Sequence, residues 1–349
     1  MPYRRTTFSK FIIEDERHRV NTDPELTGLL NDIQTGCKFI ASAVSRGALA
    51  TEPDGEAKEL VGTAREIMLR ECEWGGKLCG MVFGGIERPY LIPVSYPRGR
   101  YLLAFDPLAG SSNLDVNVTV GTIFSVLRAP DGVTAPETAD FLQPGTRQIA
   151  AGFAQFGPTS MIVITLGAGV HGFTLDREIG AYTLTHPDMR IPEETREFAI
   201  DASGERFWEQ PVRHYVEECV AGGAGARGVD FAMRWTDSLV AEVFRILVRG
   251  GLLIHPRAEK DAAEYGGLRV LYEANPMAMI VEEAGGAASN GRERILDLVP
   301  ASLHACVPVI LGSRLEVERL ERYHQTHDSG EELAFDTPLF NTRSLFRTL

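Results

Sequence analysis

The sequence predicts a layered α/β fold in two domains, and three observations support that prediction. Amphipathic helices open the chain, alternating apolar strands follow them, and helices and strands are mixed in the second half. A charged, proline-containing segment near residue 195 separates the two halves. We therefore expect an N-terminal domain over residues 1–195 and a C-terminal domain over residues 196–349.

The first predicted helix covers residues 22–47. Thr22 and Glu25 have the spacing of a capping box at its start. Its apolar residues recur at the spacing of one helical face, and they are Leu26, Leu29, Leu30, Ile33, Cys37, Ile40 and Val44. A second helix is predicted over residues 56–73, with an inner face made of Leu60, Ala64, Ile67 and Met68.

Strands follow these helices. The apolar run at residues 100–105 ends at Asp106, and residues 113–120 alternate apolar and polar side chains, so we expect a loop between two strands. Residues 160–176 are predicted to form a hairpin that turns at residues 167–169. In the second half the patterns predict helices over 207–223, 237–251 and 275–286, and strands over 251–256 and 307–313.

Composition limits the function classes. The chain has 349 residues, 44% of them hydrophobic, which allows a large core, and a formal net charge of −13, which disfavours binding to nucleic acid. The 5 cysteines are scattered without a paired motif, which indicates reduced thiols. Charges interrupt the N-terminus before an apolar segment forms, so we expect a cytoplasmic protein without a membrane segment.

The stretch FDPLAGSSNLD, residues 105–115, is the first candidate site. The amides of Gly110, Ser111 and Ser112 can point into one concavity and hold a phosphate. Asp106, at the end of a strand, suits magnesium, which prefers oxygen ligands. The alternative is an ordinary Asp-Pro turn followed by serines that face solvent.

Longer motifs identify a family. FDPLAGSSNLDVNVTVGTIFSVLR, LYEANPMAMIVEEAGGAASNGRERILD and DREIGAYTLTHPDMRIP closely resemble class I fructose-1,6-bisphosphatase of the bacterial type, over nearly the whole chain. The resemblance implies a two-domain α/β/α/β/α sandwich of the sugar-phosphatase fold, assembled as a homotetramer. It also implies magnesium-dependent hydrolysis of fructose 1,6-bisphosphate in gluconeogenesis or the Calvin cycle.

The metal ligands that the resemblance implies are only partly present. Asp106, the backbone carbonyl of Leu108 and Glu273 match family ligands. Four ligand positions hold residues without a side-chain oxygen, namely Val61, Gly84, Gly85 and Ala109. A further glycine-acid pair of the family stands reversed as Asp54-Gly55, and its alignment stays open. We therefore expect magnesium binding to be weakened or lost, and we assign no catalytic base.

The substrate-binding end is also altered. By resemblance, the sugar and its phosphates would contact Asp201, Arg234, His255 and Arg269 together with the loop at residues 110–112. Family donors near this end are replaced by Gly204, Gly267 and Trp235. His255 is expected to be a packing or hydrogen-bonding residue and not a new base.

The family's AMP site is matched in part. Glu25, Thr27, Arg100, Tyr101 and Arg128 are compatible with it. The two positions before Glu25 hold an aspartate and a proline where a threonine and a glycine are expected, and proline removes an amide donor from the helix start. A capped helix at a subunit interface is the preferred interpretation.

These observations predict a fructose-1,6-bisphosphatase homologue that is impaired or inactive in catalysis and has a binding or regulatory role. The alternative is an active fructose-1,6- or sedoheptulose-1,7-bisphosphatase with a rebuilt metal site, for which the candidate ligands are Glu87, Glu282 and Glu283. A third possibility is a binding subunit that forms a hetero-oligomer with an active paralogue.

Overall fold

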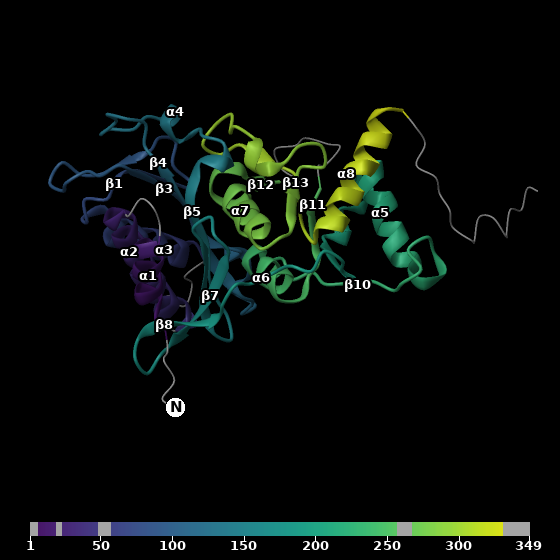
Figure 1. Cartoon of the computed structure of the whole chain (residues 1–349), viewed down its shortest axis with the longest axis horizontal. Helices are drawn as coiled ribbons and strands as arrows, with labels where there is room; N and C mark the ends of the chain where they lie inside the picture. Colours follow the sequence, from purple (N-terminus) through teal and green to yellow (C-terminus); the bar gives the residue numbers. More distant parts are fainter. Residues whose placement is uncertain (1–5, 19–22, 48–56, 257–266, 331–349) are drawn as a thin grey trace, which may run out of the picture.

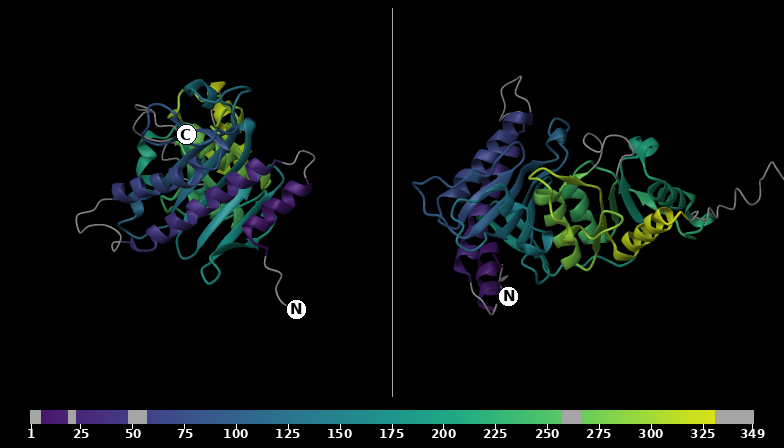
Figure 2. Two further views of the ribbon diagram at one scale, coloured as in Figure 1. Left: turned by 90° about the vertical axis from the view of Figure 1, so that its left-hand side faces the viewer. Right: turned by 90° about the horizontal axis from the view of Figure 1, so that it is seen from above.

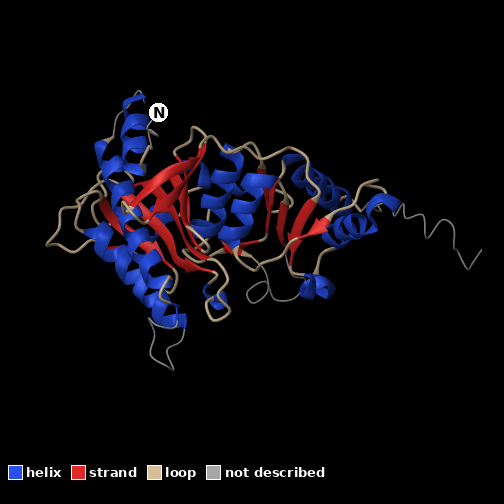
Figure 3. Cartoon of the chain, turned by 90° about the horizontal axis from the view of Figure 1, so that it is seen from below, coloured by secondary structure: helices blue, strands red, loops and turns tan. Residues whose placement is uncertain are grey.

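The computed structural model describes residues 6–18, 23–47, 57–256 and 267–330. Figure 1 shows five layers that follow one another across the molecule: helices, a large sheet, helices, a smaller sheet and helices. In Figure 3 the two sheets, in red, alternate with the helical layers, in blue. The expected α/β/α/β/α sandwich is therefore confirmed.

The first sheet has 8 strands in the order β2-β1-β3-β4-β5-β6-β7-β8. Strands β1 and β3 are parallel, and the other neighbours pair antiparallel. The predicted hairpin at 160–176 is confirmed by the antiparallel pair β6 and β7. The strands of this sheet are β1 (Leu78–Phe83), β2 (Tyr90–Leu91), β3 (Tyr101–Ala109), β4 (Val120–Arg128), β5 (Gln148–Phe156), β6 (Ser160–Thr165), β7 (Val170–Asp176) and β8 (Ala181–His186).

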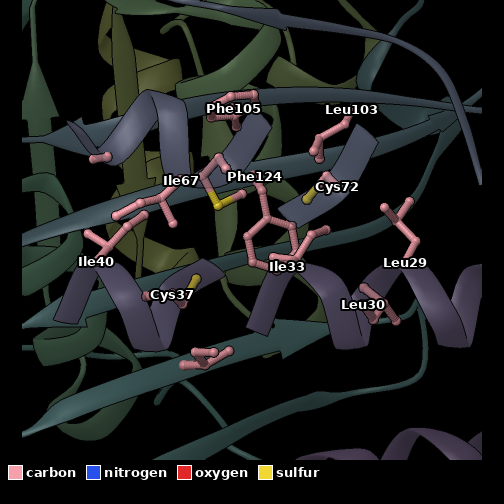
Figure 4. Packing of buried hydrophobic residues seen from close by; sticks show 14 of the residues in the cluster. Leu29, Leu30, Ile33, Cys37, Ile40, Ile67, Cys72, Leu103, Phe105 and Phe124 are labelled. Atoms are coloured by element: carbon pink, nitrogen blue, oxygen red, sulfur yellow. The ribbon is translucent and has the colours of Figure 1, made fainter. Parts of the chain in front are cut away.

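Three helices, α1 (Phe8–His18), α2 (Pro24–Val44) and α3 (Ala57–Glu73), cover the outer face of this sheet, as the left view in Figure 2 shows. The apolar faces predicted for the second and third of them are buried against β3 and β4. Figure 4 shows Ile33 and Cys37 of α2 facing Ile67 and Cys72 of α3. This burial supplies the hydrophobic stabilisation of the outer layer.

Helices α6 (Leu239–Arg249) and α7 (Asn275–Glu283) form the middle layer between the sheets. Helices α5 (Gln210–Ala221) and α8 (Arg314–Asp328) cover the far face of the second sheet. That sheet has 5 strands in the order β10-β9-β11-β15-β13. They are β9 (Glu197–Ile200), β10 (Ala232–Met233), β11 (Leu252–His255), β13 (Ala287–Ser289) and β15 (Val309–Gly312).

The remaining elements are short. Helix α4 (Thr138–Phe141) precedes β5, and strands β12 (Leu268–Arg269) and β14 (Cys306–Val307) form a separate antiparallel pair. Among the described residues, no helix is long and apolar enough to span a bilayer.

Three local predictions need correction. Residues 113–119 do not form a strand: Val116 is 64% exposed, and pairing begins only at Val120. The N-cap of α2 is Asp23, and its side chain makes no capping hydrogen bond, whereas Thr22 lies outside the described residues. Asn275 does not cap α7, because a π-helical turn at residues 270–274 leads directly into that helix.

The two halves of the chain share one core around α6 and α7. Ile123 and Val163 of the first sheet belong to the same buried cluster as Ile246 of α6 and Met277 of α7. The strands of the large sheet end at residue 186, and those of the second sheet begin at residue 197. The domain boundary at residue 195 stays a prediction.

Candidate active site

Asp106 and Glu273 come together although they are far apart in the chain. Asp106 lies on β3, where the register with β4 shifts, and its Oδ1 accepts a hydrogen bond of 3.1 Å from the amide of Leu108. Glu273 lies in the π-helical turn before α7, and its Oε2 accepts a hydrogen bond of 2.6 Å from the amide of Arg269. The two carboxyl groups lie close enough to each other to affect each other's pKa.

Burial and mutual contact change the protonation of this pair. Burial raises the pKa of both carboxyl groups, and the charge of Asp106 raises the pKa of Glu273 further. Both shifts favour a protonated carboxyl group over two carboxylates side by side.

The four positions where the resemblance expects ligands offer no side-chain oxygen. A Cβ at Gly84 would lie 3.9 Å from the hydroxyl of Tyr272, its nearest neighbour, and a Cβ at Gly85 would meet nothing within 4 Å. Ala109 is buried and pairs with Gly121 of β4. Val61 of α3 packs against the outer core. The Asp54-Gly55 pair lies outside the described residues.

The candidate substitute ligands are engaged elsewhere or exposed. Glu282 forms an ion pair of 2.6 Å with Arg294, and Glu283 accepts a hydrogen bond of 3.2 Å from the amide of Gly169. Glu87 is exposed in the turn after β1. In the described part of the chain, no three His, Cys, Asp or Glu side chains are grouped so as to hold a metal ion. The side chains that the structure describes therefore do not fit the expected magnesium site.

The loop predicted to hold a phosphate makes a tight turn. Gly110 has φ +75°, and residues 111–113 form a short 3₁₀ helix whose first bond, 2.9 Å long, runs from the Asn113 amide to the Gly110 carbonyl. This geometry leaves the amides of residues 110–112 outside the helix's own hydrogen bonds. The side chain of Asn113 donates a 2.8 Å bond to the carbonyl of Asp237, which anchors the cradle to the segment before α6.

The residues expected at the sugar end each have partners within the chain. Near His255, the ring of Trp235 lies 5.6 Å away, and burial lowers the pKa of this histidine to about 4, so its ring is neutral at pH 7. Asp201 accepts a 2.9 Å bond from the amide of Ser203. Arg234 forms an ion pair of 3.6 Å with Glu197.

Arg269 lies beside Glu273, whose carboxylate accepts a hydrogen bond from its backbone amide. Its guanidinium donates a 2.7 Å bond to the carbonyl of His304. Gly267, just before it, has φ +135°, a backbone conformation that suits glycine and that the lysine expected from the resemblance rarely adopts.

The sequence did not reveal a polar link beside the carboxyl pair. The hydroxyl of Tyr272 lies 2.9 Å from Nδ1 of His304, whose Nε2 contacts the carbonyl of Ile86. This link joins the turn after β1, which carries Gly84 and Gly85, to the second half of the chain. Aromatic residues in an apolar run indicate core, so no pattern pointed to this role.

The residues expected at the regulatory end do come together. Arg100, Tyr101 and Arg128 surround the carboxylate of Asp23. They line a 610 Å³ cavity together with Thr27, and Glu25 pairs with Arg100 at its edge.

Comparison with known proteins agrees with this arrangement. Residues 6–187 match the family model for the fructose-1-6-bisphosphatase N-terminal domain, and residues 191–325 match that for the C-terminal domain. The chain is 57% identical over 355 aligned residues to a fructose-1,6-bisphosphatase class 1 of Methylacidiphilum infernorum, covering 99% of both chains. It is 51% identical to that of Hydrogenophilus thermoluteolus, covering 98% of this chain and 97% of the other.

Solved structures are similar along most of the chain. The holo form of Leishmania major fructose-1,6-bisphosphatase superposes with a TM-score of 0.84 at 32% identity, covering 92% of this chain and 99% of the other. The T-state of the same enzyme gives a TM-score of 0.84 at 31% identity with the same coverage. On the strength of its two family domains, its sequence identity and its five layers, this chain belongs to the class 1 fructose-1,6-bisphosphatase family.

Proposed function

We propose that this chain keeps the sugar-phosphate-binding framework of its family but has lost most or all of the phosphatase activity. The observation that carries the proposal is that, in the described part of the chain, Asp106 and Glu273 have no third His, Cys, Asp or Glu side chain grouped with them to hold a metal ion. Magnesium needs several oxygen ligands. The four positions that would complete its shell hold Val61, Gly84, Gly85 and Ala109.

The size of the expected loss follows from what metals contribute. Metal ions clamp a phosphate and generate the attacking hydroxide in phosphate-ester hydrolysis, which is worth several kcal/mol. A loss of about 4 kcal/mol lowers a rate roughly a thousandfold. The chain's remaining groups at the site are two carboxyls and a backbone cradle, which bind and orient a phosphate but do not activate water strongly. Because the remaining groups can bind a phosphate but activate water only weakly, we infer a binding or regulatory role.

The second candidate is an active phosphatase for fructose 1,6- or sedoheptulose 1,7-bisphosphate. The observation that favours it is the 57% identity to a protein named fructose-1,6-bisphosphatase class 1. Such an enzyme would need a rebuilt metal site. Of the three candidate carboxylates, Glu282 and Glu283 are held by other partners, which weighs against this candidate.

Finer features of the family stay proposals for this chain. A homotetramer and magnesium are expectations from resemblance. An impaired subunit could regulate an active paralogue by assembling with it. Arg234 is relevant to this idea because its side chain is half-exposed and, in the family, this arginine reaches a neighbouring subunit. A cytoplasmic location stays a prediction from composition.

Restoring the ligands tests the proposal. We expect a variant carrying Val61→Asp, Gly84→Glu and Ala109→Asp to release phosphate from fructose 1,6-bisphosphate with magnesium at least about a hundredfold faster than the unaltered chain, because these changes return three carboxylates. Adding Gly85→Glu completes the set at a position with φ +88°. Calorimetry with the bisphosphate measures binding separately from turnover.

The matched control is Gly62→Glu, which adds a carboxylate next to Val61 on α3 where an added Cβ meets nothing within 4 Å. Successive helical residues point about 100° apart, so this carboxylate faces a different direction. No gain is expected from it. Fast turnover by the unaltered chain favours the second candidate, and a folded restored variant without any gain contradicts the link between the missing ligands and the lost activity.

A further inference from the structure

The side chain of His304 lies where three segments of the chain meet. The first is the exposed turn after β1, residues 84–88, and the second is the π-helical turn at residues 270–274, which carries Glu273. The third is the turn at residues 301–305, which leads into β14. The ring of His304 contacts one group in each of the other two turns. It therefore connects the turn after β1 with the turn that carries Glu273.

Main-chain groups fix the position of His304. Its carbonyl accepts a 2.7 Å bond from the guanidinium of Arg269, and the carbonyl of the next residue, Ala305, accepts a 2.8 Å bond from the amide of Val270. The preceding residue, Leu303, is buried in an apolar cluster that it shares with the π-helical turn. The backbone on both sides of the ring is thus held against that turn.

The hydrogen bonds of the ring have only one possible direction when the imidazole is neutral. The carbonyl of Ile86 has no proton, so Nε2 of His304 donates to it. The other nitrogen, Nδ1, is then an acceptor, and the hydroxyl of Tyr272, 2.9 Å away, donates to it. The result is a directed chain from the Tyr272 hydroxyl through the ring to the Ile86 carbonyl. An apolar ring of the same size supplies neither bond.

The two ends of this chain lie beside the candidate site. Tyr272 directly precedes Glu273, and its side chain is 4% exposed. Ile86 follows two glycines, which have no side chain with which to contact the second half of the chain. An added Cβ at Gly84 would lie 3.9 Å from the Tyr272 hydroxyl, so the same hydroxyl also faces the turn. The chain of hydrogen bonds therefore sets the spacing between this turn and Glu273.

We propose that His304 is a positioning residue for the candidate site, whose ring holds residues 84–88 at a set distance from Glu273. It acts through Tyr272 and Ile86 and not by contact with a ligand. The proposal concerns the geometry of the site and applies to an active or an inactive chain. It rests on the proposed function only for the turnover measurement described below.

Packing alone gives a different expectation for the same residue. The ring of His304 lies 6.0 Å from that of Tyr272 at an angle of 74°, an edge-to-face arrangement that phenylalanine reproduces. If packing were the role of this ring, phenylalanine would replace it better than glutamine does. If the hydrogen bonds matter, glutamine would replace it better than phenylalanine does. The two explanations therefore rank the same substitutions in opposite order.

Hydrogen-exchange mass spectrometry on the full chain tests the proposal without turnover. We expect His304→Phe to speed amide exchange of residues 84–88 at least about fivefold, because both hydrogen bonds are lost. His304→Gln should stay within about twofold of the unaltered chain, since its amide nitrogen can still donate to the Ile86 carbonyl. Tyr272→Phe should also speed exchange there, although less, because it removes only the first bond of the chain.

The matched control is Tyr323→Phe, which removes a tyrosine hydroxyl that donates a 2.8 Å bond to Glu218 on the far face of the second sheet. It should leave exchange at residues 84–88 unchanged. Unchanged exchange in the hairpin of β6 and β7 establishes that each variant is folded. The proposal is overturned if His304→Phe leaves exchange at residues 84–88 unchanged. It is also overturned if His304→Gln speeds that exchange as much as His304→Phe does, or more.

Turnover gives a second readout, which depends on the proposed function. In the restored variant with Val61→Asp, Gly84→Glu and Ala109→Asp, we expect added His304→Phe to lower kcat at least about tenfold and to change KM less than about threefold, because the new carboxylate on the turn is then misplaced. Added His304→Gln should retain kcat. An unchanged kcat on adding His304→Phe contradicts the proposal. If the restored variant is inactive, the proposed function fails, and the exchange measurement still decides the role of His304.

Discussion

Gly84 and Gly85 have different backbone requirements, although both stand where the family has a glutamate. Gly85 has φ +88°, which side chains of L residues rarely adopt, whereas no such angle is found at Gly84. An added Cβ at Gly84 meets only the Tyr272 hydroxyl, at 3.9 Å. An added side chain is therefore strained at Gly85 but not at Gly84.

A pair of alanine variants checks this difference. We expect Gly85→Ala to lower the free energy of unfolding by about 1–2 kcal/mol because of its positive φ. Gly84→Ala should leave the free energy unchanged or raise it by up to about 1 kcal/mol, through reduced freedom of the unfolded chain. Urea denaturation measures both, and each variant is the other's control. A larger loss at Gly84 than at Gly85 contradicts the backbone argument.

A single residue was predictable from the sequence where it lies within a recognisable motif. Ala109 stands out because the rest of its loop matches the family motif. The partners of Asp23 were not predictable, because Tyr101 is 78 positions away and meets it only through the fold. The same holds for Asp106 and Glu273, which come near each other because the π-helical turn at residues 270–274 lies against β3.

At the scale of elements, Arg292 joins the ends of two outer helices. Its guanidinium donates a 2.7 Å bond to Asp328 at the end of α8 and lies 3.3 Å from Glu209, which precedes α5. The buried His324 of α8 also approaches Glu209. Hydrogen bonds from His324 and Arg292 outweigh burial and lower the pKa of Glu209 to about 2.

This shift predicts a pH dependence of stability. Because the folded-state pKa of Glu209 lies below its usual value of 4.5, its contribution is present above about pH 4.5 and is lost as the pH falls toward 2. We expect Glu209→Gln to lower the unfolding free energy by roughly 2 to 3 kcal/mol at pH 6, with a smaller difference from the unaltered chain at pH 3.

Urea denaturation at both pH values measures this difference. The control is Glu205→Gln, which changes an exposed glutamate in the turn before α5. Its difference in unfolding free energy from the unaltered chain should be the same at both pH values. A Glu209→Gln effect of equal size at pH 3 and pH 6 contradicts the assigned role of the carboxylate.

Elements with strong periodicity were predicted well. Helices α2 and α3 and the hairpin of β6 and β7 follow directly from apolar spacing and turn glycines. The strand predicted over residues 113–119 does not form, and the backbone shows why. Asn117 adopts φ 57°, a left-handed conformation that interrupts an extended strand. Helix α1, with charged residues throughout, gave no clear signal.

At the scale of the whole molecule, the candidate site residues lie where the two halves share a core. The cradle follows β3 of the large sheet, Glu273 precedes α7 of the middle layer, and His255 ends β11 of the second sheet. The layered fold was predictable from element order and family motifs, and buried apolar clusters hold its layers together. The metal ligands contribute little to that core, so they can change without loss of the fold.

The most direct test of this account is phosphate release from fructose 1,6-bisphosphate by the unaltered chain, at high enzyme concentration with magnesium or manganese. We predict a rate at least about a thousandfold below that of the Methylacidiphilum infernorum relative measured beside it, with the bisphosphate still bound. Comparable rates for the two proteins would contradict the account, because the positions without an oxygen ligand would then not limit catalysis.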